Sequence, residues 1–68
     1  MPKHYTALVF NDGLDPRMEH FTSLAHAINY ARTYLESGIA LVQEKDTGRP
    51  LARYVAEGGR SPKLVDSF

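Results

Sequence analysis

A run of aromatic and β-branched residues, His4 to Phe10, predicts a first strand near the start of the chain. Asn11-Asp12-Gly13 follows it, and asparagine or aspartate before glycine supplies the positive φ angles of a tight hairpin turn. The next stretch, 14–21, is ambiguous, because Pro16 cannot donate a hydrogen bond inside a strand. It is either a loop that leads into a helix or, from Arg17 to Phe21, a short strand. We favour the strand.

The clearest element is an amphipathic helix that begins after two good N-cap residues, Thr22 and Ser23. Apolar residues then recur at intervals of three and four positions, which is the period of one helical face. Gly38 supplies a left-handed stop, so we expect a helix of about four turns. The predicted apolar stripe contains Leu24, Ala27, Ile28, Ala31, Tyr34 and Leu35.

A second hairpin is predicted after the helix, with strands at 39–44 and 51–55. Its turn carries Gly48 at the left-handed bulge position. Pro50 lies at the start of the last strand, where a missing N–H costs least.

The composition changes after Ala56 to glycine, serine, proline and charged residues, as is typical of linkers and mobile ends. We therefore expect a single domain at 1–56 and a flexible C-terminal tail at 57–68. The apolar residues of this tail are able to dock, on a surface that the sequence does not identify; they are Leu64, Val65 and Phe68.

These elements predict the α+β class: an antiparallel sheet of three to four strands, in ββαββ or βαββ order, with one amphipathic helix packed on one face. Pairing outward from a bulge at Gly48 puts Leu41 opposite Arg53 and Gln43 opposite Leu51. A slip of one residue would exchange the two faces of the sheet. We expect the bulkier set beneath the helix, namely Leu8, Phe10, Ile39, Leu41, Leu51 and Val55.

The other face is then open, and it carries small and aromatic side chains instead of the polar ones that a solvated face has. Flat apolar patches mark contact sites when they reach several hundred Å². The alternative is a smaller patch, or one that the tail covers. We interpret the patch as an interface for a second copy of the chain or for a small protein partner. The candidate interface residues are Tyr5, Ala7, Val9, Ala40, Val42, Ala52 and Tyr54.

Composition supports association. The chain has 68 residues, and a chain so short buries only about 60% of the surface that its unfolded form exposes. It has no cysteine, which excludes disulfides and thiolate zinc sites. Eight basic and eight acidic residues give a net charge of zero, which removes the self-repulsion that keeps small domains apart. No apolar run is long enough to span a membrane and no signal-peptide pattern is present, so we expect a cytoplasmic protein.

The titratable residues show no catalytic or metal-binding pattern. Three histidines form neither an i, i+4 pair nor an HExxH motif: His4, His20 and His26. Three acidic residues lie close before His20, and a carboxylate beside a histidine is the minimum for acid–base catalysis; they are Asp12, Asp15 and Glu19. Turns favour aspartate for local hydrogen bonding, however, and so small a domain has little room for an enclosed pocket. We therefore predict no enzyme activity, no catalytic or metal-binding residue and no cofactor.

The second half of the chain is locally basic, which offers an alternative function. Cationic side chains around an exposed tyrosine form a platform on which bases stack and phosphates bind. The zero net charge disfavours nucleic acid as a partner. The candidate contacts for this alternative are Arg49, Arg53, Tyr54, Arg60 and Lys63.

The run Phe21 to Ala31, FTSLAHAINYA, resembles the helix opening of small bacterial sheet-plus-helix domains, among them the antitoxin-like HicB domains. In those domains a strand ends in a capping residue before an alanine-rich amphipathic helix. They place their strands mostly before the helix, whereas a hairpin follows the helix here. The resemblance implies a sheet-plus-helix fold and transfers no functional residue to this chain.

The sequence thus predicts a small noncatalytic interaction domain that self-associates through its open sheet face as a homodimer. Weak nucleic-acid binding or a regulatory role through the basic hairpin is the alternative.

Overall fold

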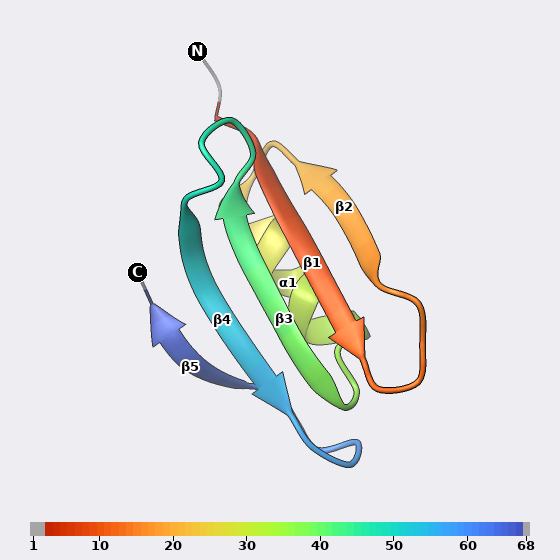
Figure 1. The fold of residues 1–68 in the computed structure, drawn as a ribbon. Helices are drawn as coiled ribbons and strands as arrows, with labels where there is room; N and C mark the ends of the chain where they lie inside the picture. The colour runs from red at the N-terminus through yellow and green to blue at the C-terminus, as the bar shows by residue number, and fades with distance from the viewer. Residues whose placement is uncertain (1–2, 68) are drawn as a thin grey trace.

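The computed structural model describes residues 3–67, which contain one helix and five strands. The elements in chain order are β1 (Tyr5–Asn11), β2 (Arg17–Phe21), α1 (Leu24–Tyr34), β3 (Gly38–Glu44), β4 (Pro50–Ala56) and β5 (Lys63–Ser67). The strands form one antiparallel sheet in the order β2-β1-β3-β4-β5, and α1 lies across one of its faces (Figure 1). The predicted α+β class with a single helix is confirmed, but the sheet has five strands instead of three or four, in the order ββαβββ.

The ambiguous stretch before the helix contains the favoured short strand. β2 spans Arg17–Phe21 and pairs with β1, so that Leu8 lies opposite Met18. Pro16 precedes the strand and stays outside the ladder, where its missing N–H has no cost.

The prediction of a flexible tail is wrong for Lys63–Ser67, because these residues form β5 at the edge of the sheet. Gly58 and Gly59 have φ angles of 55° and 79°, which glycine adopts readily, and they turn the chain back along β4. Two consecutive glycines therefore make a turn here and not a linker. Among the described elements β5 contacts β4 alone, and the predicted docking residue Phe68 lies outside the described residues.

The register of the β3–β4 hairpin is confirmed where the strands are far from their turn, since Leu41 lies opposite Arg53. Near the turn the ladder is irregular, and Gln43 pairs with Pro50 instead of Leu51. Because Pro50 has no N–H to donate, one hydrogen bond of a regular ladder cannot form there.

The helix covers the opposite face of the sheet from the one predicted. The residues predicted to lie on the open face are packed beneath α1, and Ala7, Val9 and Val42 have no exposed surface. The residues predicted beneath the helix point away from it, and Phe10 and Ile39 are exposed. Since successive residues of a strand point to opposite faces, a wrong choice of face exchanges every assignment and leaves the strand pairing intact.

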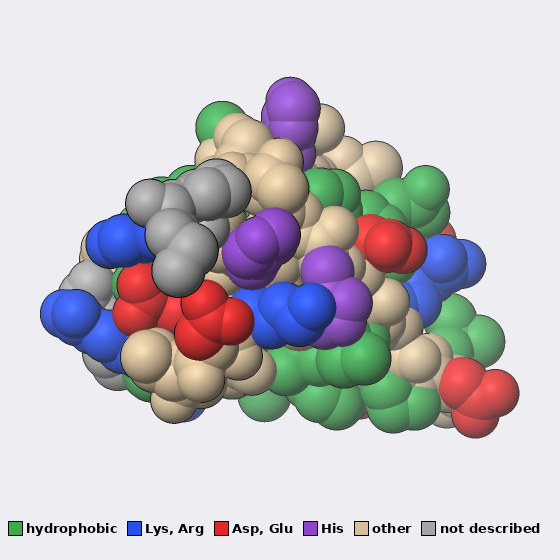
Figure 2. Space-filling view, turned by 90° about the horizontal axis from the view of Figure 1, so that it is seen from above, with side chains coloured by type: hydrophobic (Ala, Val, Ile, Leu, Met, Phe, Trp, Pro, Cys, Tyr) green, Lys and Arg blue, Asp and Glu red, His purple; other side chains and the backbone are tan. Residues whose placement is uncertain are grey.

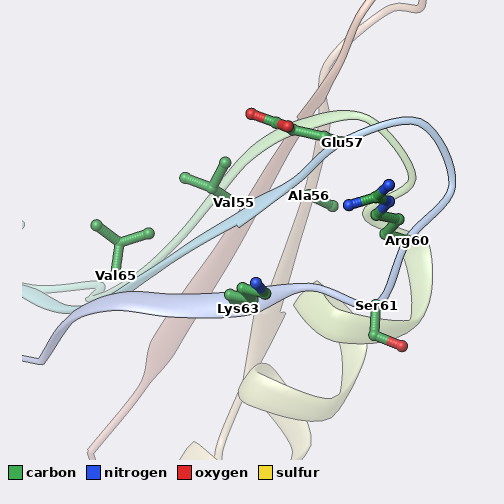
Figure 3. Close-up of a pocket in the computed structure, with 7 residues that line it drawn as sticks. All are labelled: Val55, Ala56, Glu57, Arg60, Ser61, Lys63 and Val65. Atoms are coloured by element: carbon green, nitrogen blue, oxygen red, sulfur yellow. The ribbon is translucent and has the colours of Figure 1, made fainter.

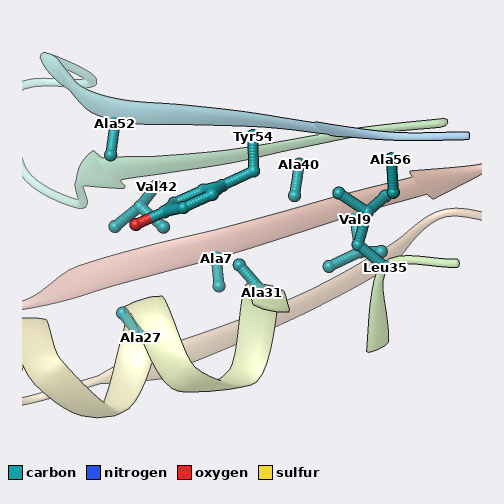
Figure 4. Packing of buried hydrophobic residues seen from close by; sticks show 10 residues of the cluster. All are labelled: Ala7, Val9, Ala27, Ala31, Leu35, Ala40, Val42, Ala52, Tyr54 and Ala56. Carbon is teal, nitrogen blue, oxygen red and sulfur yellow. The ribbon is translucent and has the colours of Figure 1, made fainter. Parts of the chain in front are cut away.

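Small side chains explain which face the helix covers. Six of the ten buried hydrophobic residues are alanines: Ala7, Ala27, Ala31, Ala40, Ala52 and Ala56. Alanines of α1 meet alanines of the sheet, and Tyr54 lies along the core between them (Figure 4). Val9 and Val42 are the largest side chains that are fully buried. Tyr54 and Leu35 are the bulky side chains of this core, and a further one such as Phe10 would have to displace its neighbours, because protein interiors are close-packed.

α1 begins as predicted and ends earlier than predicted. The side-chain oxygen of Ser23 accepts a hydrogen bond from the His26 N–H (3.4 Å), which confirms Ser23 as the N-cap. The helix ends at Tyr34, and the next residue, Leu35, is extended and buried in the core. Gly38 is therefore the first residue of β3 and not the stop of the helix.

The side chain of Asn11, at the end of β1, stabilises the end of the helix instead. Its Oδ1 accepts hydrogen bonds from the N–H groups of Glu36 (2.7 Å) and Ser37 (3.1 Å), and its Nδ2 donates to the Tyr34 carbonyl (2.8 Å). The last carbonyls of a helix lack partners within it, so a side chain that supplies one stabilises the helix end. Asn11 thereby joins the end of β1, the end of α1 and the start of β3.

Gly38→Ala is expected to lower the free energy of unfolding by on the order of 3 kcal/mol or more. A Cβ at Gly38 would lie 1.9 Å from the Phe10 carbonyl oxygen, and the φ angle there is 149°. Gly48→Ala is the matched control, because its φ is also positive (72°) while nothing lies within 4 Å of the added Cβ. We expect that control to lose about 1–2 kcal/mol in chemical denaturation. Equal losses in the two variants would contradict the role of the Phe10 contact.

Asn11→Ala is expected to lower the free energy of unfolding by about 2–3 kcal/mol, because three hydrogen bonds are lost together. Asn29→Ala, on the exposed side of α1, is the control, with an expected change below about 0.5 kcal/mol. Thermal or chemical unfolding followed by circular dichroism measures both. Losses of the same size would show that Asn11 does not stabilise the helix end.

Candidate interaction surface

The side of the sheet away from α1 carries bulky apolar side chains in two neighbouring rows that run across the strands. The first row consists of Met18, Leu8 and Leu41, and the second of Phe10, Ile39 and Val55. Cross-strand neighbours have Cβ atoms about 4.5–5.5 Å apart, so the two rows form one continuous patch. We call these six residues the open face.

The bulkiest of these side chains extend into solvent. The exposed fraction is 44% for Phe10, 59% for Met18 and 47% for Ile39. Seen from above, hydrophobic side chains gather along the lower margin of the molecule, which is the side of the open face (Figure 2). A shallow depression of about 360 Å³ on this side is lined by Phe10, Asp12, Gly38, Ile39, Leu41 and Arg53.

Polar groups border the open face on two sides. Toward the start of β1 the next cross-strand row is polar, and Thr6 Oγ1 lies 3.0 Å from His20 Nδ1. On the side of β4 and β5, Arg53 forms an ion pair with Asp66. Both side chains of this pair are partly exposed, so the pair itself contributes at most about 1 kcal/mol to stability. An apolar centre with a polar rim is the usual anatomy of a protein interface.

The two edge strands are less suited to association than the open face. β2 and β5 have five residues each, and Pro16 and Pro62 precede them. β2 also carries the charged residues Arg17 and Glu19. Short edge strands with charges and nearby prolines resist the addition of a strand from another chain.

The residues predicted to form an open interface do not lie on an open surface, so that prediction is wrong. Six of its residues belong to the core and Tyr5 packs against it; the six are Ala7, Val9, Ala40, Val42, Ala52 and Tyr54. An open apolar face exists, but on the other side of the sheet. The sequence contains one sign of this, because Arg53 lies in register with Leu41 and a charged side chain is costly beneath a helix.

The nucleic-acid alternative requires Tyr54 to be exposed, and in the structure it is buried. Tyr54 is 8% exposed, and it faces α1, so no base can stack on it. Arg53 points to the opposite face, where it pairs with Asp66. The predicted platform of Tyr54 and Arg53 is therefore wrong, since adjacent residues of one strand point to opposite faces.

The other basic residues of that alternative lie at two different ends of the sheet. Arg49 is in the turn before β4, whereas Arg60 and Lys63 follow the end of β4. Arg60 and Lys63 line a small depression of about 250 Å³ together with Val55 and Val65 (Figure 3).

The residues considered for acid–base chemistry are not brought together. Glu19 and His20 are neighbours on β2, so their side chains point to opposite faces. His20 lies beside Thr6, and Asp12 accepts a hydrogen bond from the Ser37 hydroxyl (3.3 Å). Within residues 3–67 no three histidine or acidic side chains are grouped so as to hold a metal ion.

Comparison with known proteins adds no further guide to function. No protein-family model, curated protein or solved structure matches the chain. The resemblance of residues 21–31 to HicB-like helix openings stays a prediction. The described part of the chain contains no helix of the length and apolar character needed to cross a membrane.

Tyr54→Ala is expected to lower the free energy of unfolding by about 3–5 kcal/mol, because it removes a large side chain from the core. Tyr34→Ala is the matched control, since Tyr34 is 41% exposed and its ring packs against Tyr30 and Arg17. Its expected loss is about 1 kcal/mol. Chemical denaturation measures both. Unchanged stability of Tyr54→Ala, together with weaker binding to single-stranded nucleic acid, would favour the stacking platform instead.

Proposed function

We propose that this chain is a small, noncatalytic, cytoplasmic interaction domain that binds a second copy of itself through the open face. The observation that carries the proposal is the distribution of side-chain size. Six of the ten buried hydrophobic residues are alanines, whereas Phe10, Met18 and Ile39 remain exposed on the uncovered side of the sheet. Burial of apolar surface contributes roughly 25 cal/mol per Å², so these side chains gain most from a partner.

The dimensions of the molecule suit such a contact. It measures 39 × 22 × 17 Å along its principal axes. The whole broad side is thus about as large as the roughly 800 Å² that each partner buries in an interface of standard size, and this sets an upper limit on the area the open face can bury. Two sheets that pack face to face, about 10 Å apart, form a common and well-packed arrangement.

A second copy also supplies burial that one chain lacks. Among residues 3–67 the largest fully buried side chains are those of Val9 and Val42, and the six core alanines contribute little apolar surface each. A chain of 68 residues is marginally stable by its size, and it has no cysteine for a disulfide. Zero net charge imposes no long-range repulsion between copies. Association through apolar side chains therefore adds stability at little electrostatic cost.

The absolute mass in solution tests the proposal. Light scattering on a sizing column is expected to give twice the 7.6 kDa of one chain, at both low and moderate salt. The mass should change little with salt, because apolar burial provides most of the binding. A monomer at high concentration would refute self-association and leave the open face to another partner. A salt-dependent nucleic-acid titration would then be the next measurement.

Three aspartate variants locate the contact. Ile39→Asp is expected to give a folded monomer, because it puts a charge at the centre of the open face. Leu64→Asp is the matched control, since Leu64 is 53% exposed but pairs with Tyr54 and so faces the other side. That variant should remain a dimer. Val42→Asp should fail to fold, because it buries an unpaired charge. A dimeric Ile39→Asp variant would exclude the open face as the interface.

A further inference from the structure

We propose that the two copies pack open face to open face about a two-fold axis that runs along β3. In this dimer the acidic loop 12–16 of each copy meets the basic segment 57–63 of the other. The inference rests on the proposed self-association and adds the orientation of the partner. A closed two-fold arrangement is the commonest symmetry of homodimers.

The topology of the sheet makes β3 a natural axis. β3 is the middle strand, with β1 and β2 on one side and β4 and β5 on the other (Figure 1). When two such sheets face each other, a two-fold axis along β3 places β3 on its own counterpart. The same axis lays the β1–β2 half of one copy over the β4–β5 half of the other. Facing sheets commonly keep their strands within about 30° of each other, which this axis allows.

The two halves of the open face differ in polarity, and this axis brings unlike halves together. The β1–β2 half presents Leu8, Phe10 and Met18, whereas the β4–β5 half presents Val55, Lys63 and the Arg53–Asp66 ion pair. The aliphatic stems of Arg53 and Lys63 are able to cover apolar side chains of the partner while their charged ends reach water. An axis across the strands would instead lay each half on its own counterpart.

The two oppositely charged segments leave the sheet at the same end. β1 ends at Asn11 and β4 ends at Ala56, and both residues pair with Gly38 of β3. The loop after β1 and the turn after β4 therefore lie on opposite sides of β3 at one end of the strands (Figure 1). A two-fold axis along β3 exchanges these two sides and keeps the end, so it brings each loop to the partner's turn.

The acidic loop borders the open face. It contains Asp12 and Asp15, and no basic residue lies between positions 12 and 16. Asp12 lines the depression that Phe10 and Ile39 share. Arg17, the first basic residue after the loop, is stacked over the Tyr34 ring of α1, on the other side of the sheet.

The basic segment borders the open face on the other side of β3. Arg60 and Lys63 belong to it, with Glu57 as its one acidic residue. Lys63 pairs with Val55, and its side chain rises on the same side of the ribbon (Figure 3). The described part of the chain gives neither Arg60 nor Lys63 an ion-pair partner. Complementary charges at the rim of an interface fix its orientation more than its affinity.

Two double variants test this orientation. The first carries Arg60→Glu and Lys63→Glu, and the second carries Asp12→Lys and Asp15→Lys. In a homodimer of either variant both loop contacts join like charges, so the dissociation constant should rise roughly tenfold or more at low salt. In a mixture of the two variants each loop contact again joins opposite charges. Light scattering and native mass spectrometry should therefore find a heterodimer in the mixture and monomers of each variant alone.

The outcomes separate this inference from the proposed function. Variants that dimerise as readily as the unchanged chain would overturn the orientation, while self-association would stand. A mixture that stays monomeric, although each variant is folded, would also overturn the orientation. A monomeric unchanged chain would refute the proposed function itself.

A second pair of variants guards against loss of folding. Asp12 also accepts a hydrogen bond from the Ser37 hydroxyl, so its replacement removes an internal contact. The single variants Asp15→Lys and Lys63→Glu avoid this, because no side-chain hydrogen bond or ion pair of the described residues involves either one. They should again favour the heterodimer in a mixture, with a smaller difference between homodimer and heterodimer affinities.

Discussion

The packing of α1 on small side chains of the sheet determines the rest of this structure. α1 contributes Ala27 and Ala31 to the contact, and the facing strands contribute further alanines. Tyr54 and Leu35 are the bulky side chains that this core buries, and alternate residues of a strand must point to the other face. Phe10 and Ile39 are therefore exposed as a consequence of how the core is packed. The candidate surface and the core are the two sides of the same strands, so a change in one strand's register would alter both.

Most elements could be predicted from the sequence because their signals are local. The N-cap at Ser23 and the short strand after Pro16 depend on adjacent residues. The end of α1 could not be predicted in this way, because it depends on Asn11, which lies 23 residues before Tyr34. β5 could not be predicted for a different reason, since paired glycines such as Gly58-Gly59 occur both in linkers and in tight turns. Only the pairing of the strand after them distinguishes the two.

The sequence predicted that one apolar face of the sheet is left uncovered by the helix, but it did not predict which residues lie on that face. Both sets of alternate residues in β3 and β4 are largely apolar, so periodicity alone cannot tell which set the helix covers. The choice depends on side-chain volume, and here the smaller set is covered. The hypothesis of an open interface thereby moves from Val42 and Tyr54 to Ile39 and Phe10. The stacking platform fails for the same reason, because Tyr54 belongs to the covered set.

The hydrogen bonds of Asn11 also affect how the domain opens and closes. They connect groups that are 23 to 26 residues apart in the chain. Contacts so distant in sequence form late, because the intervening chain must first be brought together. Helix ends usually fray before the rest of a domain unfolds. Here the amides of Glu36 and Ser37 donate to a side chain of β1, so fraying of the helix end also breaks contacts with the sheet.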